Sequence, residues 1–398
     1  MEPLTRVQIS VAALLLLQVS DFTCQKTVSE IIKKVRQKRD VALSYYSKKF
    51  DGIALKQLKV PKKRLKKAFE SLSAEEKKAL EAAARNIEFF AKKQLPRSWQ
   101  KKRNSVLLGE IVKPIDSVGV YVPAGRFPLV SSVLMNCIPA RVAGVKQIVL
   151  CTPPKASSKV LAAAFLLGIK NVFLVGGAQA IAAMAFGTES VPRVCKIVGP
   201  GNAFVAEAKR QLFGVVDIDM PAGPSEVLVY ANKGKPDWIA AELRAQAEHA
   251  DDAKSVFLTT NKTLARKIKK LVQTQANISI VLAKSKVQAV AFINDFAPEH
   301  LVLFDGARLL PKIQNAGSIF VGAYSAVAFG DYCSGSNHVL PTAGFAKARA
   351  GLGARDFVKA VAFQKVSKNG AKALAKTGIA LARMEGLKEH EKSIELRG

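Results

Sequence analysis

Only four histidines occur in this 398-residue chain, and each stands close to a carboxylate or an amide. The four segments are Gln246-Ala-Glu-His249, Ala297-Pro-Glu-His300, Asp331-Tyr-Cys-Ser-Gly-Ser-Asn-His338 and Glu385-Gly-Leu-Lys-Glu-His390. Imidazole titrates near neutral pH and is also a common metal ligand. A lone histidine is more often a structural residue, but four with polar neighbours indicate a metal site or an acid–base centre.

Two of these residues could bind one metal ion from a single helix. Gln246 and His249 are three positions apart in a segment predicted to be helical, so their side chains share one face. Zinc accepts nitrogen and oxygen ligands without any cysteine, and a catalytic ion keeps one position for water or substrate. Asp331 and His390 could complete the set. Spacing alone does not show that the four converge, so structural histidines remain an alternative.

Glu299 and His300 form an adjacent carboxylate and imidazole. They follow Pro298 and precede the apolar run Leu301–Phe304, which places them on a loop that enters a strand. A partly buried glutamate can have its pKa raised toward neutrality, where histidine also titrates, so the two could act as base and acid. The alternative is an ordinary surface loop.

Three glycine turns follow predicted strands. They are Tyr121-Val-Pro-Ala-Gly125, Gly176-Gly-Ala-Gln179 and Gly199-Pro-Gly-Asn202. A turn that opens a helix can hold a phosphate on the helix N-terminal amides. The last turn departs from G-x-G-x-x-G, and no acidic residue stands at the usual distance, so the nucleotide signal is weak. Glycine turns also make any ordinary α/β connection.

The elements that position these residues change in character along the chain. Up to about residue 105 the pattern is helical, with a capping box at Ser73 and Glu76 and a stop at Pro96. Short β-branched runs then alternate with helical stretches, which is typical of β-α-β-α folds. The predicted strands are Val118–Val122, Ile148–Cys151, Val172–Val175, Lys196–Val198, Val227–Tyr230, Val256–Thr259, Ile278–Leu282, Leu301–Phe304 and Ile319–Val321. In such sheets ligands bind beyond the carboxyl ends of the strands, so we expect the chemistry there.

Taken together, the motifs closely resemble the histidinol dehydrogenase family, in order from about residue 26 to 397. The matching segments are Val120-Tyr121-Val-Pro, Gly176-Gly-Ala-Gln179, Gly199-Pro-Gly-Asn202, Asp219-Met-Pro-Ala-Gly-Pro-Ser225-Glu226, Gln246-Ala-Glu-His249, Ala297-Pro-Glu-His300-Leu, Gly330-Asp331-Tyr and Ser336-Asn-His338-Val-Leu-Pro-Thr342. No single motif is decisive, but eight in the right order are.

The resemblance implies a zinc-dependent, NAD-linked four-electron oxidation of L-histidinol through histidinal to L-histidine, the last step of histidine biosynthesis. It assigns one Zn²⁺ per subunit to Gln246, His249, Asp331 and His390. The implied substrate-binding residues are Ser225, Gln246, His249, His300, Asp331, His338, Glu385 and His390. The implied NAD contacts are Tyr121, Gln179 and Asn202, and the implied catalytic pair is Glu299 and His300.

Residue chemistry agrees with these roles. His300 can take the alcohol proton while hydride leaves for NAD, and Glu299 can then deprotonate the water that hydrates the aldehyde. A cysteine thiohemiacetal at Cys151 or Cys137 is the competing route, although their apolar neighbours indicate buried, inert thiols.

The expected fold is α/β, with two Rossmann-like open domains of mainly parallel strands plus helical N-terminal and C-terminal segments. We expect a helical arm over 1–30, a first α/β domain over 31–118 and 226–355 with most metal and catalytic residues, and a second, NAD-binding domain over 119–225. The helical tail over 356–398 is expected to form a homodimer whose site is shared between subunits, as the resemblance implies for Glu385 and His390.

Composition limits the alternatives. The five cysteines are far apart without a C-x-x-C pair, which favours reduced thiols in the cytoplasm. The apolar run Val11–Leu17 lacks a basic cluster before it, so a buried or amphipathic helix is favoured over a secretion signal. No apolar run reaches eighteen residues, so we expect no membrane-spanning helix. The net charge is +30, and residues 26–103 carry 24 Lys and Arg against 8 Asp and Glu. We interpret this as a solvated basic surface without a specific nucleic-acid partner, although nucleic-acid binding remains an alternative, as does oxidation of a related amino alcohol or polyol.

Overall fold

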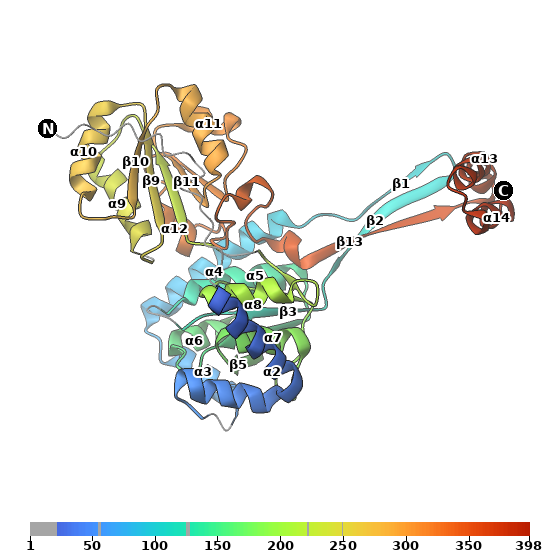
Figure 1. Cartoon of the computed structure of the whole chain (residues 1–398), viewed down its shortest axis with the longest axis horizontal. Helices are drawn as coiled ribbons and strands as arrows, with labels where there is room; N and C mark the ends of the chain where they lie inside the picture. The colour runs from blue at the N-terminus through green and yellow to red at the C-terminus, as the bar shows by residue number, and fades with distance from the viewer. Residues whose placement is uncertain (1–21, 55–56, 125–127, 221–222, 249) are drawn as a thin grey trace.

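The structure, a computed structural model, describes residues 22–54, 57–124, 128–220, 223–248 and 250–398. The predicted arm over 1–30 and the run Val11–Leu17 fall largely or wholly outside these residues. Two five-stranded parallel sheets, each flanked by helices, confirm the predicted α/β fold. A third, three-stranded sheet forms an arm that projects from the body (Figure 1). No helix in the described part of the chain is long and apolar enough to cross a membrane.

The first sheet has the strand order β5-β4-β3-β6-β7, in which every pair is parallel. Its strands are β3 (Ser117–Tyr121), β4 (Gln147–Thr152), β5 (Asn171–Leu174), β6 (Lys196–Val198) and β7 (Asp217–Ile218). Its helices are α5 (Val130–Ala143), α6 (Ser158–Leu166), α7 (Gly177–Phe186) and α8 (Ala203–Leu212). The order changes direction between β3 and β6, which is where such sheets open a crevice.

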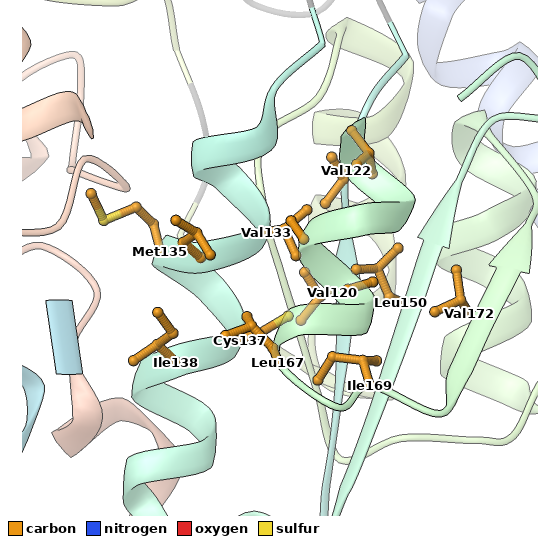
Figure 2. Close-up of a cluster of buried hydrophobic side chains, with 14 of the residues drawn as sticks. Val120, Val122, Val133, Met135, Cys137, Ile138, Leu150, Leu167, Ile169 and Val172 are labelled. Atoms are coloured by element: carbon orange, nitrogen blue, oxygen red, sulfur yellow. The ribbon is translucent and has the colours of Figure 1, made fainter. Parts of the chain in front are cut away.

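Apolar side chains fill both faces of this sheet, as is usual for parallel strands covered by helices. Val120 on β3, Val133 on α5 and Leu150 on β4 are fully buried in one cluster. Figure 2 shows these side chains gathered between the sheet and α5, together with Cys137. The continuous apolar runs in the sequence therefore became the centre of the sheet.

The N-terminal helices belong to this first sheet. They are α2 (Phe22–Tyr46), η1 (Ser47–Asp51), α3 (Lys62–Glu70) and α4 (Ala74–Gln94). Helix α2 packs on α7 and α8, α3 packs on α6, and α4 packs on α5. The domain division expected from the sequence differs here, because it placed 31–118 with 226–355. The division failed because amphipathic helices reveal an apolar face but not the partner that will cover it.

The second sheet has the order β10-β9-β8-β11-β12, again with parallel pairs. Its strands are β8 (Glu226–Tyr230), β9 (Lys254–Thr259), β10 (Ile278–Leu282), β11 (His300–Leu303) and β12 (Ser318–Val321). Its helices are α9 (Pro236–Ala247), α10 (Lys262–Val272), α11 (Lys286–Phe296) and α12 (Val327–Tyr332), with short 3-10 helices η2 (Ala307–Lys312), η3 (Phe345–Lys347) and η4 (Ala354–Phe357). All nine predicted strand runs overlap strands of these two sheets.

The arm combines two distant parts of the chain. Strands β1 (Trp99–Arg103), β2 (Val106–Pro114) and β13 (Val358–Val366) pair antiparallel in the order β1-β2-β13. Helices α13 (Lys368–Met384) and α14 (Lys388–Glu395) form its tip (Figure 1). The tail was predicted to be helical only, and β13 was missed because most of its residues are exposed, so no buried face left an alternating pattern.

Candidate active site

The acid–base pair lies at the amino ends of β8 and β11. His300 is the first residue of β11, Glu299 precedes it, and the backbone of Val227 on β8 is the register partner of His300. The candidate pair in this sheet therefore lies at the edge opposite to the carboxyl ends, where the sequence predicted the chemistry. Asn232, just after β8, occupies the carboxyl edge with hydrogen bonds to Thr259, Thr260 and Asp305, among others. The residues near the C-terminal ends of α9 and α12 lie at the opposite edge, on the side of Glu299 and His300.

Glu299 and His300 are buried, each 5% exposed, which excludes the surface-loop alternative. Glu299 Oε2 accepts a hydrogen bond from the backbone N–H of Glu226 at 2.7 Å. His300 Nδ1 lies 3.1 Å from the carbonyl oxygen of Glu226, which can only accept, so Nδ1 carries the proton. Nε2 of His300 has no hydrogen-bond partner among the described residues and lies 3.6 Å from Asp331 Oδ1. In the neutral imidazole Nε2 is thus a free proton acceptor.

Opposing effects act on the pKa of His300. Burial by itself lowers the pKa, but the charges of Glu299 and Asp331 outweigh it and raise the pKa to about 10. To act as a base, His300 must be neutral, and this requires a lower pKa. Because the carboxylate of Asp331 is one cause of the rise, a cation on that carboxylate would lower the pKa of His300 again.

His338 faces the same region from the segment after α12. Its Nδ1 donates to the carbonyl oxygen of Asp331 at 3.0 Å, and its Nε2 lies 3.5 Å from Ser132 Oγ on α5. Burial lowers the pKa of His338 and keeps the ring neutral. The contact with Ser132 brings the helix that covers the first sheet to the edge of the second sheet. Ser225, half-buried, lies directly before β8 at the same edge.

Helices α9 and α12, which carry two of the expected metal ligands, are joined by a hydrogen bond. Glu242 on α9 accepts a hydrogen bond at Oε2 from the backbone N–H of Val327, the first residue of α12, at 3.0 Å. Gln246 lies one turn further along α9 and is 4% exposed, with Nε2 unpartnered among the described residues. Asp331 lies on α12. The pKa of Glu242 is raised mainly by burial, and the charge of Asp331 adds to the rise.

These residues fit a zinc ion as far as they are described. The carbonyl oxygen of the buried Gln246 amide, the carboxylate of Asp331 and an imidazole are donors of the type that zinc accepts. His249 lies outside the described residues, and those residues contain no cluster of three His, Cys, Asp or Glu able to hold a metal. Glu385 and His390 are exposed on the arm, away from β11 (Figure 1), so one chain does not bring them to this edge.

The three expected NAD contacts lie at the carboxyl edge of the first sheet. Tyr121 ends β3, and its hydroxyl accepts from the N–H of Gly177 at 3.0 Å at the start of α7. Burial raises the pKa of Tyr121 to about 12, so it stays neutral. Gln179 is 2% exposed in the first turn of α7. Asn202 caps α8 by accepting from Val205 N–H at 3.1 Å.

The turn before Asn202 requires glycine and is held by a buried ion pair. Gly199 has φ +114°, and a Cβ there would lie 2.1 Å from the carbonyl oxygen of Tyr121. Lys209 on α8 forms an ion pair with Asp219. Lys209 also donates to the carbonyl oxygen of Gly199, and Asp219 accepts from the Gly199 N–H. This pair was not predicted from the sequence, although Asp219 opens one of the segments that resemble the family. A lysine within a helix and an aspartate after a strand give no sign in the sequence that they will be buried together.

The structure also bears on the thiol route. All five cysteines are unpaired. Cys151 on β4 and Cys137 on α5 are fully buried in the first sheet's core, away from β11, and burial raises the pKa of both thiols, to about 12 for Cys137. Neither thiol can act as the nucleophile.

The fold and this site define an α/β protein with two parallel sheets and a buried pair of carboxyl and imidazole side chains, Glu299 and His300. A family model for histidinol dehydrogenase matches residues 18–398. A histidinol dehydrogenase of Methanosarcina mazei is 46% identical, covering 93% of this chain and 91% of its own length. One of Bacillus anthracis is 41% identical over 94% and 92%. The crystal structure of histidinol dehydrogenase from Elizabethkingia anophelis superposes with a TM-score of 0.90 at 37% identity, covering 94% of this chain and 92% of that one.

The chain therefore belongs to the histidinol dehydrogenase family. It is an oxidoreductase that acts on a small-molecule substrate in the last step of histidine biosynthesis. The family and the reaction class expected from the motifs, an oxidoreductase of the last step of histidine biosynthesis, are confirmed.

Proposed function

We propose that the chain oxidises L-histidinol through L-histidinal to L-histidine in two NAD-linked steps that depend on zinc. The observation that carries this proposal is the buried pair of Glu299 and His300, whose free Nε2 faces Asp331 across 3.6 Å. A base for the alcohol and a base for water are what a four-electron oxidation of an alcohol needs.

In the first step His300 Nε2 takes the alcohol proton. NAD, when bound, accepts the hydride. Glu299 then takes a proton from water as its oxygen adds to the aldehyde, and His300 returns its proton to the former carbonyl oxygen. The hydrate that results is the substrate for the second oxidation. Glu226 N–H, at 2.7 Å from Glu299 Oε2, holds that carboxylate in place throughout.

Gln246, His249, Asp331 and His390 would hold the zinc ion. When bound it would act as a Lewis acid for the substrate and fix its orientation. Ser225, His338 and Glu385 would contact the substrate from the protein side. A neutral His338 suits an uncharged hydrogen bond to substrate.

Glu385 and His390 would complete the site of a second copy, in a homodimer with two-fold symmetry. The arm supports this, because its tip leaves apolar side chains exposed, including Leu381 at 53%, Met384 at 83% and Leu396 at 76%. NAD would bind at Tyr121, Gln179 and Asn202. As a biosynthetic enzyme with reduced cysteines it would work in the cytoplasm, and its basic surface would bind no specific nucleic acid.

One assay tests the proposal. NADH formation from histidinol is followed with and without a chelator, and the metal content of the purified protein is measured in parallel. We expect about one zinc per chain, and activity that is lost with the chelator and regained with zinc. Full activity without stoichiometric metal would refute the zinc site, and activity only on another amino alcohol or polyol would refute histidinol.

A further inference from the structure

Glu226 contacts both members of the acid–base pair through its backbone. Its N–H donates to Glu299 Oε2 at 2.7 Å, and its carbonyl oxygen accepts from His300 Nδ1 at 3.1 Å. The residue opens β8 and is 0% exposed. No role in the proposed reaction has yet been given to its side chain, although this side chain is a fully buried carboxyl group beside the base.

The side chain is only half satisfied as a carboxylate. Oε1 accepts from the N–H of Ala343 at 3.2 Å, whereas Oε2 has no partner among the described residues. Ala343 has φ 53°, a left-handed conformation that is costly for alanine, so this amide is held against Glu226 by the surrounding structure. A buried charged oxygen without a hydrogen bond is unfavourable, which favours the protonated form.

The charged groups that face Glu226 are Glu299 and His300, at the start of β11, and Lys254, its register partner on β9. Burial and then the negative charge of Glu299 raise the pKa of Glu226 to about 7, whereas Lys254 and the backbone N–H groups of Ala343 and Glu299 oppose the rise. Two neighbouring carboxyl groups that cannot both ionise easily behave as a coupled pair.

We propose that Glu226 is a positioning residue whose buried carboxyl group carries a proton at acidic pH and whose ionisation strengthens Glu299 as the base for water. Glu226 N–H holds the Glu299 carboxyl group at 2.7 Å, so a charge on the Glu226 side chain acts on a neighbour of fixed position. The inference rests on the proposed role of Glu299 as the base for water.

The affected step is hydration of the aldehyde. One O–H bond of water breaks and its proton goes to Glu299, while the water oxygen bonds to the aldehyde carbon. The electron pair of the carbonyl moves to its oxygen, which takes the proton that His300 holds. A second negative charge on Glu226 would favour the proton on Glu299, so this step would become faster above the ionisation of Glu226.

The test compares wild type with Glu226→Gln, which keeps the shape of the side chain and stays neutral at every pH. The measurement is the rate of histidinal oxidation across the neutral range. We expect the ratio of the wild-type rate to the variant rate to rise about threefold as the pH passes through 7. The reason is that ionisation of Glu226 makes Glu299 a stronger base in the wild type only. A ratio that does not change with pH would overturn the proposal. Glu81→Gln, an exposed carboxylate on α4, is the matched control and should follow the wild type.

A second measurement needs no substrate. Infrared titration of the wild type should show a carboxylic-acid carbonyl band at mildly acidic pH that fades as the pH rises through 7, and Glu226→Gln should lack it. Absence of the band in wild type means that Glu226 is ionised throughout, and it overturns the proposal even if the variant does not fold. If wild type does not oxidise histidinal at all, the proposed function is wrong, while the band still reports the proton on Glu226.

Discussion

Replacing Lys209 should weaken the half of the protein proposed to bind NAD. The side chains of Lys209 and Asp219 are 3% and 2% exposed, and they form an ion pair. Lys209 Nζ donates to the carbonyl oxygen of Gly199 at 3.0 Å, and Asp219 Oδ2 accepts from Gly199 N–H at 2.8 Å. Lys209→Met keeps most of the side-chain volume but leaves the buried carboxylate of Asp219 without its counter-charge.

The expected cost follows from that burial. Removing one partner of a buried pair typically costs about 3–5 kcal/mol, because the remaining charge is stranded away from water. The matched control is Lys159→Met. Lys159 and Glu76 are 2.6 Å apart, but their side chains are 51% and 37% exposed, so water replaces the lost partner. Such surface pairs contribute about 0–1 kcal/mol.

Urea unfolding of the two variants and the double variant Lys209→Met/Asp219→Asn measures the difference. The double variant should regain part of the loss, because asparagine still accepts from Gly199 N–H and carries no charge. Since the pair fixes the turn that leads to Asn202, the KM for NAD should rise in Lys209→Met more than the KM for histidinol. Equal unfolding free energies for Lys209→Met and Lys159→Met would refute the reasoning.

Three further outcomes are expected. Glu299→Gln should lower histidinal oxidation by about a hundredfold or more, because an amide cannot take a proton from water; a wild-type rate with histidinal would contradict the role of Glu299. Between pH 4.5, the ordinary pKa of a glutamate, and about pH 7, the native state keeps the proton on Glu226 while the unfolded chain loses it. The free energy of unfolding should therefore fall by about 3 kcal/mol as the pH rises through this range. Urea midpoints of Glu226→Gln should not show that fall. His249→Asn and His390→Asn should each be nearly inactive, and their equal mixture, after refolding, should regain about a quarter of wild-type activity, because half of randomly paired dimers hold one intact site. Verified mixed dimers without activity would show that His390 does not serve the other subunit.

Local sequence determined the elements and the residue types of the site. The capping box at Ser73 and Glu76 forms as predicted, with Ser73 Oγ accepting from Glu76 N–H at 3.1 Å, because both partners lie within one helical turn. Gly199 marks a turn that no larger residue could make. Because Glu299 and His300 are neighbours in the chain, the sequence also indicated that the two would lie in the same site.

Long-range packing decided the rest. The sequence places Glu299 and His300 before a strand, but only the pairing of β11 with β8 brings them beside Glu226, and this joins residues 73 positions apart. Glu242 is visible in the sequence as the residue one turn before Gln246, yet only the contact with Val327, 85 positions away, shows that it joins α9 to α12.

Glu226 shows a property that the tertiary structure determines and the local sequence does not. The sequence names Glu226 as an ordinary glutamate after Ser225, and nothing local distinguishes it from the exposed Glu81. The tertiary structure removes its carboxyl group from water and places it beside Glu299, and this desolvation changes its chemistry. The sequence by itself determines residue types and short-range geometry. The burial of a side chain, and with it the dielectric environment, arises only when segments far apart in the sequence pack around it.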